Sequence, residues 1–264
     1  MTTNPVYILN NSWWPLLAAF SGLSFMTSFL SLLWLKSLTL SSLFLAVSAF
    51  MTLTLFYLWG QDLQRESALS GQMTETIENS LKFSFILFIS SEVMFFMSFF
   101  WAFFHYSLSP DPEIGTNWPP LGVEPIPFFE TPLLNTIILL TSGITITWAH
   151  HAFFSSKSMM STPPLTAATI LLGVYFTYLQ LEEYTTSNFS MNDSCYGSVF
   201  FLSTGFHGLH ILVGSMFLVS LLPRMVLGFN SSKDILHFEL AAWYWHFVDV
   251  VWLFLYICMY WWGE

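Results

Sequence analysis

The residues best suited to chemistry in this sequence are ionisable groups inside long apolar runs. Glu92 lies in the run SEVMFFMSFFWAFFH, where the residues at helical spacing from it are phenylalanines that offer no cation. Because a charged carboxylate in hydrocarbon costs several kcal/mol, we expect Glu92 to be largely protonated at neutral pH. It is then either a polar group at a helix contact or near a proton or lipid route, or a neutral carboxyl that is hydrogen-bonded to a neighbouring helix.

Two further pairs of ionisable residues have the spacing of one helical face. His246 and Asp249 are three residues apart in AAWYWHFVDVVW, and His207 and His210 have the same spacing in GFHGLHILVG. Side chains at i and i+3 lie beside each other on a helix. We therefore predict an interhelical polar cluster of these four residues, with a metal site as the less favoured alternative. The glycines expected to allow close helix approach are Gly205, Gly208 and Gly214.

The elements that carry these residues are predicted to be transmembrane helices. Apolar residues make up 55% of the 264 residues and charged residues only 8%, whereas a soluble domain carries about 25% charged residues. Runs of roughly 20 apolar residues can cross a bilayer, and they occur at about 14–35, 40–59, 81–105, 132–154, 163–184, 197–222 and 238–262. We predict an all-α membrane protein with seven spans, forming a single integral membrane domain over residues 1–264.

The charge balance excludes one class of partner and predicts an orientation. The formal net charge of −10 provides no basic surface for nucleic acid. The positive charges expected to share the inner side are Arg65, Lys82, Lys157, Arg224 and Lys233. Only Lys36 falls on the other side, so the N-terminus should be inside and the C-terminus outside.

The outer face is predicted to be strongly acidic. Its acids are expected at Asp111, Glu113, Glu124, Glu130, Glu182, Glu183, Asp193 and Glu264. A basic soluble partner could be steered toward this face, although acids also accumulate on translocated faces without any such role. The loop before the fourth span is rich in proline between Pro110 and Pro127, which favours an extended surface segment.

The spacing of the cysteines and histidines does not favour metal or haem ligation. The cysteines Cys195 and Cys258 are far apart and form no C-x-x-C motif. His150 and His151 are adjacent, so they point in different directions, and we interpret them as interfacial residues. We therefore predict no metal or haem site in this chain.

Several segments resemble one protein family closely. The segments are WPPLGVEPI, QDLQRES, LFISSEVMFFMSFFWAFFH, LLNTIILLTSGITITWAHH, YGSVFFLSTGFHGLHILVGS and AAWYWHFVDVVWLFLYICMYWWG. They are similar to the third subunit of mitochondrial cytochrome c oxidase, and the resemblance extends from about Trp13 to the end. It implies a core subunit of an enzyme of the mitochondrial inner membrane that passes electrons from cytochrome c to oxygen and pumps protons.

The resemblance also implies a fold and a set of partners. Members of this family have a two-helix group and a five-helix bundle, separated by a cleft that holds phospholipids. They carry no haem or copper, pack against subunits I and II and accessory subunits, stabilise the complex and sustain proton uptake. The implied orientation has the N-terminus in the matrix and the C-terminus in the intermembrane space, with cytochrome c as the partner that the acidic face would steer.

Individual positions are carried over from the family by their motifs. Glu92 in SEV matches the family's carbodiimide-reactive carboxylate. The positions that match lipid-headgroup contacts are Arg65 and Glu66 in RES, and Arg224 after the sixth span. Gly60 and Met73 replace the Trp and His that the vertebrate form of the family has there, which removes two of its lipid contacts.

Two other classes of function stay open at the level of the residues. A stand-alone proton or ion transporter is suggested by Glu92 and Asp249 near the middle of their spans, but the sequence has no internal repeat of the kind such transporters use. A haem protein in its own right would need a ligand set that the histidine spacing does not supply. The favoured interpretation is a non-redox subunit of a respiratory oxidase.

Overall fold

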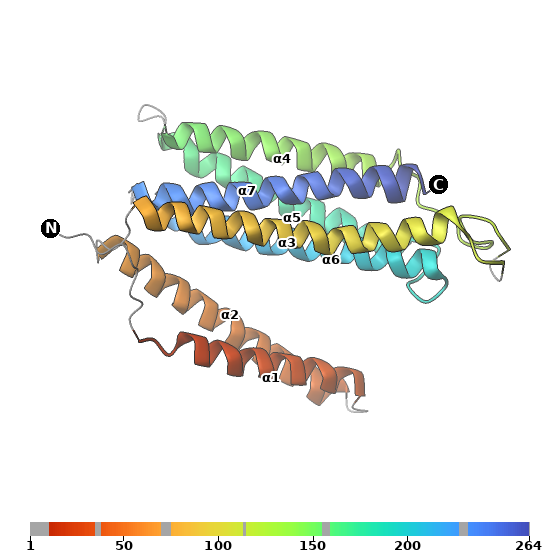
Figure 1. The fold of residues 1–264 in the computed structure, drawn as a ribbon, viewed down its shortest axis with the longest axis horizontal. Coiled ribbons are helices and arrows are strands. Elements are labelled where there is room, and N and C mark those ends of the chain that lie inside the picture. Colours follow the sequence, from red (N-terminus) through yellow and green to blue (C-terminus); the bar gives the residue numbers. More distant parts are fainter. Residues whose placement is uncertain are drawn as a thin grey trace. The chain divides into compact units, whose positions relative to one another are not determined.

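A computed structural model describes residues 11–34, 38–69, 75–112, 115–154, 159–226 and 232–263 (Figure 1). The long helices are α1 (Trp14–Trp34), α2 (Leu38–Leu69), α3 (Glu75–Leu108), α4 (Thr131–Phe154), α5 (Thr162–Thr186), α6 (Cys195–Val226) and α7 (Ser232–Leu255). A short 3-10 helix, η2 (Met159–Ser161), precedes α5, and a π-helical segment, η3 (Tyr256–Trp261), continues α7.

The prediction of an all-α protein with seven spans is confirmed. Among the described residues, 7 helices are long and apolar enough to cross a membrane. Several helices continue beyond the predicted spans, and α2 extends through the polar segment QDLQRES to Leu69. Hydropathy marks where hydrocarbon ends, whereas a helix continues as long as its residues favour it, so the helical ends lie outside the apolar runs.

The chain divides into two compact units between Asn79 and Ser80. The smaller unit contains α1 and α2, which lie side by side. The described residues that this pair buries are serines, namely Ser21, Ser28, Ser41 and Ser48. Because lipid tails are as apolar as leucine, small side chains that let helix backbones approach favour such packing.

Hydrogen bonds between side chains connect α1 and α2. The Ser28 and Ser48 hydroxyls are 2.6 Å apart in the buried contact. The indole nitrogen of Trp14 donates to Asp62 Oδ2 over 3.1 Å near the polar end of α2. The large apolar side chains of both helices, such as Phe20 and Phe50, face outward. The pair therefore buries small polar residues inside and presents apolar residues to the bilayer.

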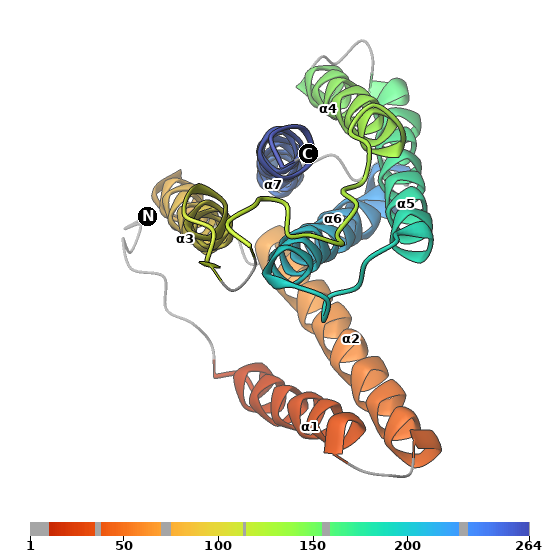
Figure 2. The same ribbon diagram turned by 90° about the vertical axis from the view of Figure 1, so that its right-hand side faces the viewer.

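In the larger unit, α4, α5, α6 and α7 close into a ring, as seen along the helices in Figure 2. In this ring α4 and α6 each pack against both α5 and α7. The helix α3 is attached through large aromatic side chains. Phe96 contacts Phe247 of α7 with ring centroids 6.2 Å apart, and Phe95 contacts Phe206 of α6 at 5.1 Å.

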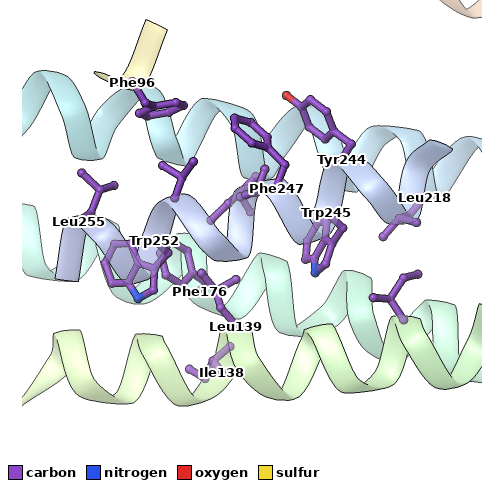
Figure 3. Packing of buried hydrophobic residues seen from close by; sticks show 14 of the residues in the cluster. Phe96, Ile138, Leu139, Phe176, Leu218, Tyr244, Trp245, Phe247, Trp252 and Leu255 are labelled. Atoms are coloured by element: carbon purple, nitrogen blue, oxygen red, sulfur yellow. The ribbon is translucent and has the colours of Figure 1, made fainter. Parts of the chain in front are cut away.

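Two tryptophans of α7 organise the interior of the ring (Figure 3). Trp245 and Trp252 are seven residues apart, so both point the same way, and both are almost fully buried. The Trp245 indole donates to Ser142 Oγ over 2.9 Å, and the Trp252 indole donates to Thr136 Oγ1 over 3.0 Å. Each ring thus fills core volume while its N–H finds a hydroxyl of α4, as a buried indole requires.

Glycines make room for Trp245. A Cβ on Gly173 of α5 would lie 2.6 Å from Trp245 Cη2, and one on Gly214 of α6 would lie 3.1 Å from Trp245 Cε3. The prediction of close packing is therefore confirmed for Gly214. It is wrong for Gly205 and Gly208, where an added Cβ would meet no atom of the described residues within 4 Å.

The proline-rich loop before α4 folds back onto the bundle instead of staying extended. The described part contains turns with backbone hydrogen bonds such as Val123 N to Pro120 O, 3.1 Å. Trp118 packs against Phe103 of α3 and Tyr196 of α6, with ring centroids 5.6 and 5.5 Å away. An aromatic residue within the loop buries apolar surface, and this favours a folded loop over an extended one.

We predict that a Ser28→Cys/Ser48→Cys double variant forms an intramolecular disulfide. The native hydroxyls are already 2.6 Å apart, so two thiols at these positions would be close to bonding distance. Non-reducing gel mobility of the chain in detergent measures the cross-link. Thr27→Cys/Ser48→Cys is the control, because Thr27 is exposed on α1. Equal cross-linking of both pairs would contradict the packing of α1 on α2.

Candidate functional site

The structure brings Glu92 of α3 together with His210 of α6. Glu92 Oε2 and His210 Nε2 are 2.9 Å apart. Both side chains are mostly buried, with 23% of the Glu92 side chain and 13% of the His210 side chain exposed. The missing partner of Glu92 is thus an imidazole of another helix. This arrangement corresponds to the helix-contact alternative in which Glu92 is hydrogen-bonded to a neighbour.

The second nitrogen of His210 determines which proton the pair shares. His210 Nδ1 is 2.7 Å from the backbone carbonyl oxygen of Phe206, and a carbonyl can only accept, so Nδ1 carries a hydrogen. In a neutral imidazole Nε2 then has a lone pair and accepts the proton of a protonated Glu92. The same contact also accommodates an ion pair, in which two charges would have to be taken out of water.

Aromatic rings enclose this pair. The His210 ring stacks on Tyr244 with centroids 6.3 Å apart and meets the edge of Phe96 at 5.0 Å. Phe247 lies 6.2 Å from the same ring. These rings pack around the imidazole and limit its rotation. Glu92 and His210 therefore form a defined two-residue site with one proton between them.

The structure does not bring together the four residues of the predicted polar cluster, which are His207, His210, His246 and Asp249. His210 faces Glu92, whereas His246 and Asp249 face α4, where His246 Nε2 is 3.3 Å from Thr147 Oγ1. His207 lies elsewhere again, with its ring stacked 5.2 Å from Trp252. A spacing of three residues shows that two side chains share a face, but it does not show which neighbouring helix that face meets.

His207 occupies the aromatic interior of the ring. It is almost fully buried, and Phe176 of α5 meets it edge-on with centroids 5.7 Å apart. Among the described residues, neither ring nitrogen has a hydrogen-bond partner. The contacts of His207 are therefore those of a core aromatic residue.

Glu183 is a buried carboxyl that the sequence did not reveal. It was expected on the acidic outer face, but only 2% of it is exposed. Tyr260 donates to Oε1 over 2.6 Å, Gln180 Nε2 donates to the same oxygen over 3.1 Å, and Thr131 donates to Oε2 over 3.1 Å. The carboxyl joins α4, α5 and the π-helical segment η3 at one end of the ring. The expectation for Glu183 was therefore wrong, while its neighbour Glu182 is exposed.

A signal for this burial was present in the spacing of α5. The buried residues at alternating steps of four and three are Thr162, Thr166, Thr169, Gly173, Phe176, Gln180 and Glu183. This is the seam of a coiled-coil-like contact. It is hard to recognise from hydropathy because small and polar residues occupy it, and hydropathy searches look for an apolar stripe.

Of the three residues matched to lipid-headgroup positions, the structure describes the side chain of Arg65. Arg65 has a side chain that is 71% exposed, and it pairs with Asp62 of the same helix over 3.8 Å. The side chains of Glu66 and Arg224 lie outside the described residues.

An ion pair connects the polar beginnings of two other helices. Lys82 near the start of α3 pairs with Glu239 near the start of α7 over 2.7 Å.

The acidic residues of the loops keep the exposure that the sequence predicts, apart from Glu183. The described ones that are exposed are Asp111, Glu124, Glu130, Glu182 and Asp193. Asn188 donates to Glu124 Oε2 over 3.0 Å and so connects the proline-rich loop with the α5–α6 loop. Glu113 and Glu264 lie outside the described residues.

The donor groups of the described part do not assemble into a metal site. Within these residues, no three His, Cys, Asp or Glu side chains come close enough together to hold a metal ion. The imidazole of His210 pairs with a carboxyl, that of His207 packs between aromatic rings, and that of His246 contacts a hydroxyl. This arrangement is compatible with the expectation that metal centres belong to other chains.

The fold and these sites define a multi-pass helical membrane protein with a few buried ionisable groups, of which Glu92 and His210 pair across two helices. A family model described as Cytochrome c oxidase subunit III matches residues 4–264. Relatives named Cytochrome c oxidase subunit 3 include those of Lumbricus terrestris, 47% identical over 100% of both chains, and Petromyzon marinus, 48% identical over 98% of this chain and 97% of the relative. That of Pisaster ochraceus is 49% identical over 99% and 98%.

The chain belongs to the cytochrome c oxidase subunit III family. It is thus part of a multi-subunit oxidoreductase of the respiratory chain. The resemblance seen in the sequence is confirmed at the level of the family.

We predict that Glu92→Gln is tolerated and Glu92→Leu is not. A glutamine amide can donate to His210 Nε2 as a protonated carboxyl does, whereas leucine leaves this nitrogen without a partner. Interhelical hydrogen bonds in membranes contribute about 0.6 kcal/mol on average and up to about 1.7 kcal/mol, so Glu92→Leu should lower thermal stability of the intact complex by that order.

Infrared difference spectroscopy tests the protonation of Glu92 in the same variants. The carbonyl stretch of a protonated carboxylic acid should be present at neutral pH and absent from Glu92→Gln. His210→Phe should shift this band because it removes the acceptor of the carboxyl proton. A carboxylate band at neutral pH that disappears in Glu92→Gln would show that the pair is ionised.

Proposed function

We propose that this chain is a non-redox core subunit of cytochrome c oxidase that stabilises the complex, holds phospholipid and supports proton uptake. The observation that carries the proposal is that Glu92, Glu183 and His210 make hydrogen bonds within the chain. Such pairing holds a scaffold together, while the oxidase reaction needs haem and copper centres, which we assign to companion subunits I and II.

Support for proton uptake comes from the Glu92–His210 pair. It can carry one proton in a largely apolar part of the bundle, and part of the Glu92 side chain is exposed. A protonated acid in such a place is also what carbodiimide modification requires, which agrees with the family motif around Glu92. The stand-alone transporter is the weaker alternative, because the family is that of a subunit in a larger oxidase.

Phospholipid binding is supported by the position of Arg65. Its guanidinium is largely exposed near the polar end of α2, where it can offer two parallel hydrogen bonds to a phosphate. We assign the same role to Arg224 and an accessory one to Glu66, both from the family motif. The ligands are phospholipids of the surrounding membrane.

We further propose the mitochondrial inner membrane as the location, with the N-terminus in the matrix and the C-terminus in the intermembrane space. The pairing of Lys82 with Glu239 supports a common side for the starts of α3 and α7, as the positive-inside rule requires. The exposed acids of the loops would then face cytochrome c, a basic soluble protein that they could steer toward the complex.

Removal of this chain from the purified complex should leave the haem spectrum unchanged and reduce the number of turnovers that the enzyme completes before it is inactivated. A subunit without redox centres contributes no Soret absorbance, whereas a stabilising subunit affects how many turnovers precede inactivation. Optical spectra and oxygen consumption over time measure the two effects. A Soret band or stoichiometric copper in the isolated chain would overturn the non-redox assignment.

Removal of the charge at Arg65 should lower the phospholipid retained by the complex. Arg65→Gln removes both the charge and the fork of donors, whereas Arg65→Lys keeps the charge and is expected to lose less. The ratio of phospholipid phosphorus to protein in the purified complex is the measurement, and Arg224→Gln should act in the same direction. An unchanged ratio in both glutamine variants argues against these headgroup contacts.

A further inference from the structure

A groove runs between α4 and α7 on the outside of the larger unit. It has a volume of about 660 Å³ and its walls are mainly apolar, with Leu140, Ile144 and Trp148 from α4 and Val250 and Leu253 from α7. These residues recur every three or four positions on their helices. The α4 side continues to His151 and extends over about 16 Å, or three helical turns. The groove therefore has the length and the parallel walls that suit a third helix.

The floor of the groove contains a carboxyl group. The Asp249 side chain is only 9% exposed, and among the described residues its Oδ1 has no hydrogen-bond partner. The absence of a side chain at Gly143 makes room for it, since a Cβ there would lie 2.6 Å from Asp249 Oδ2. A buried carboxyl without a partner is costly in hydrocarbon.

The neighbouring imidazole does not satisfy this carboxyl. Thr147 donates its hydroxyl hydrogen to the carbonyl oxygen of Gly143 over 2.7 Å, so the contact of 3.3 Å between Thr147 Oγ1 and His246 Nε2 requires the nitrogen to donate. In the neutral ring, His246 Nδ1 is then an acceptor. It lies 3.9 Å from Asp249 Oδ2, beyond hydrogen-bond distance. Among the described residues, His246 therefore donates no hydrogen bond to the Asp249 carboxyl at the floor of the groove.

The depth of Asp249 restricts what can supply that donor. It lies near the middle of the apolar span Leu236–Trp261, about 18 Å from either end at 1.5 Å per residue. Phospholipid headgroups stay at the interface, and acyl chains carry no donor. A polar group at this depth has to be brought by another transmembrane segment, where it would be shielded from lipid.

We propose that the α4–α7 groove binds a transmembrane helix of a companion subunit, and that a hydrogen-bond donor of this helix reaches the side of the Asp249 carboxyl that faces the groove. The small residues Gly143 and Thr147, four positions apart on α4, would let its backbone approach closely. The apolar walls supply packing, while the carboxyl sets the register of the docked helix. The groove is thereby an interface within the complex rather than a lipid-facing surface.

A density map of the intact complex, purified in its native lipids, tests the proposal directly. The expected result is helical density along the groove, with a side-chain N–H or O–H of the companion within hydrogen-bond distance of the Asp249 carboxyl. Acyl-chain density in the groove would overturn the proposal. So would a docked helix whose residues at that depth carry no donor, or a second copy of this chain in the groove.

Variants test the same interface in solution. Ile144→Trp should fill the groove and lower the amount of this chain that copurifies with the haem-bearing subunits severalfold. Leu171→Trp on α5 is the matched control, because Leu171 and Ile144 are 68% and 66% exposed and only Ile144 lines the groove. The membrane-inserted amount of each variant, measured in the same cells, corrects for any loss of folding.

The carboxyl is tested by a second pair of variants. Asp249→Asn keeps an oxygen that can accept the companion's hydrogen bond and should retain most of the chain in the complex. Asp249→Leu removes this acceptor and should retain less. Equal retention of Ile144→Trp and Leu171→Trp, or of Asp249→Asn and Asp249→Leu, contradicts a donor-specific helix contact.

Discussion

The constraint on which this structure depends is that a polar group buried in hydrocarbon must find its partner within the protein. The indoles of Trp245 and Trp252 donate to hydroxyls of α4, and Glu183 accepts from three donors on separate elements. Except for the bond from Gln180, which lies on the same helix as Glu183, each of these contacts connects one helix to another element. Since lipid offers the helices no hydrophobic reason to associate, such contacts and close packing hold the ring together.

The two units satisfy this constraint in different ways. In the α1–α2 pair, buried serines allow close approach and Ser28 bonds to Ser48. In the larger unit, bulky rings fill the interior, and glycines such as Gly173 accommodate the largest of them. Some buried polar atoms have no partner among the described residues, including the ring nitrogens of His207 and Asp249 Oδ1. Asp249 also lines the α4–α7 groove, which marks the place where the chain is expected to be completed by another.

Features that depend on neighbouring residues in the sequence could be predicted, whereas contacts between residues far apart in the sequence could not. Seven helices, the buried Glu92 and the family could be recognised from runs of residues along the chain. The partner of Glu92 could not, because His210 is 118 positions away, and the i, i+3 pairs suggested a different grouping. Glu183 was misplaced for a related reason, since an acid near the end of a span suits either the surface or a buried seam.

Hydropathy and motif content are properties of short stretches of sequence, so the spans, the apolar character and the rarity of charge followed from the residues alone. The rotation of each helix about its axis is decided by packing against several neighbours at once. That rotation separates His207, His210 and His246, turns Glu183 inward and exposes the α4–α7 groove. Only the tertiary structure contains this information, because it depends on side chains far apart in the chain that meet in space.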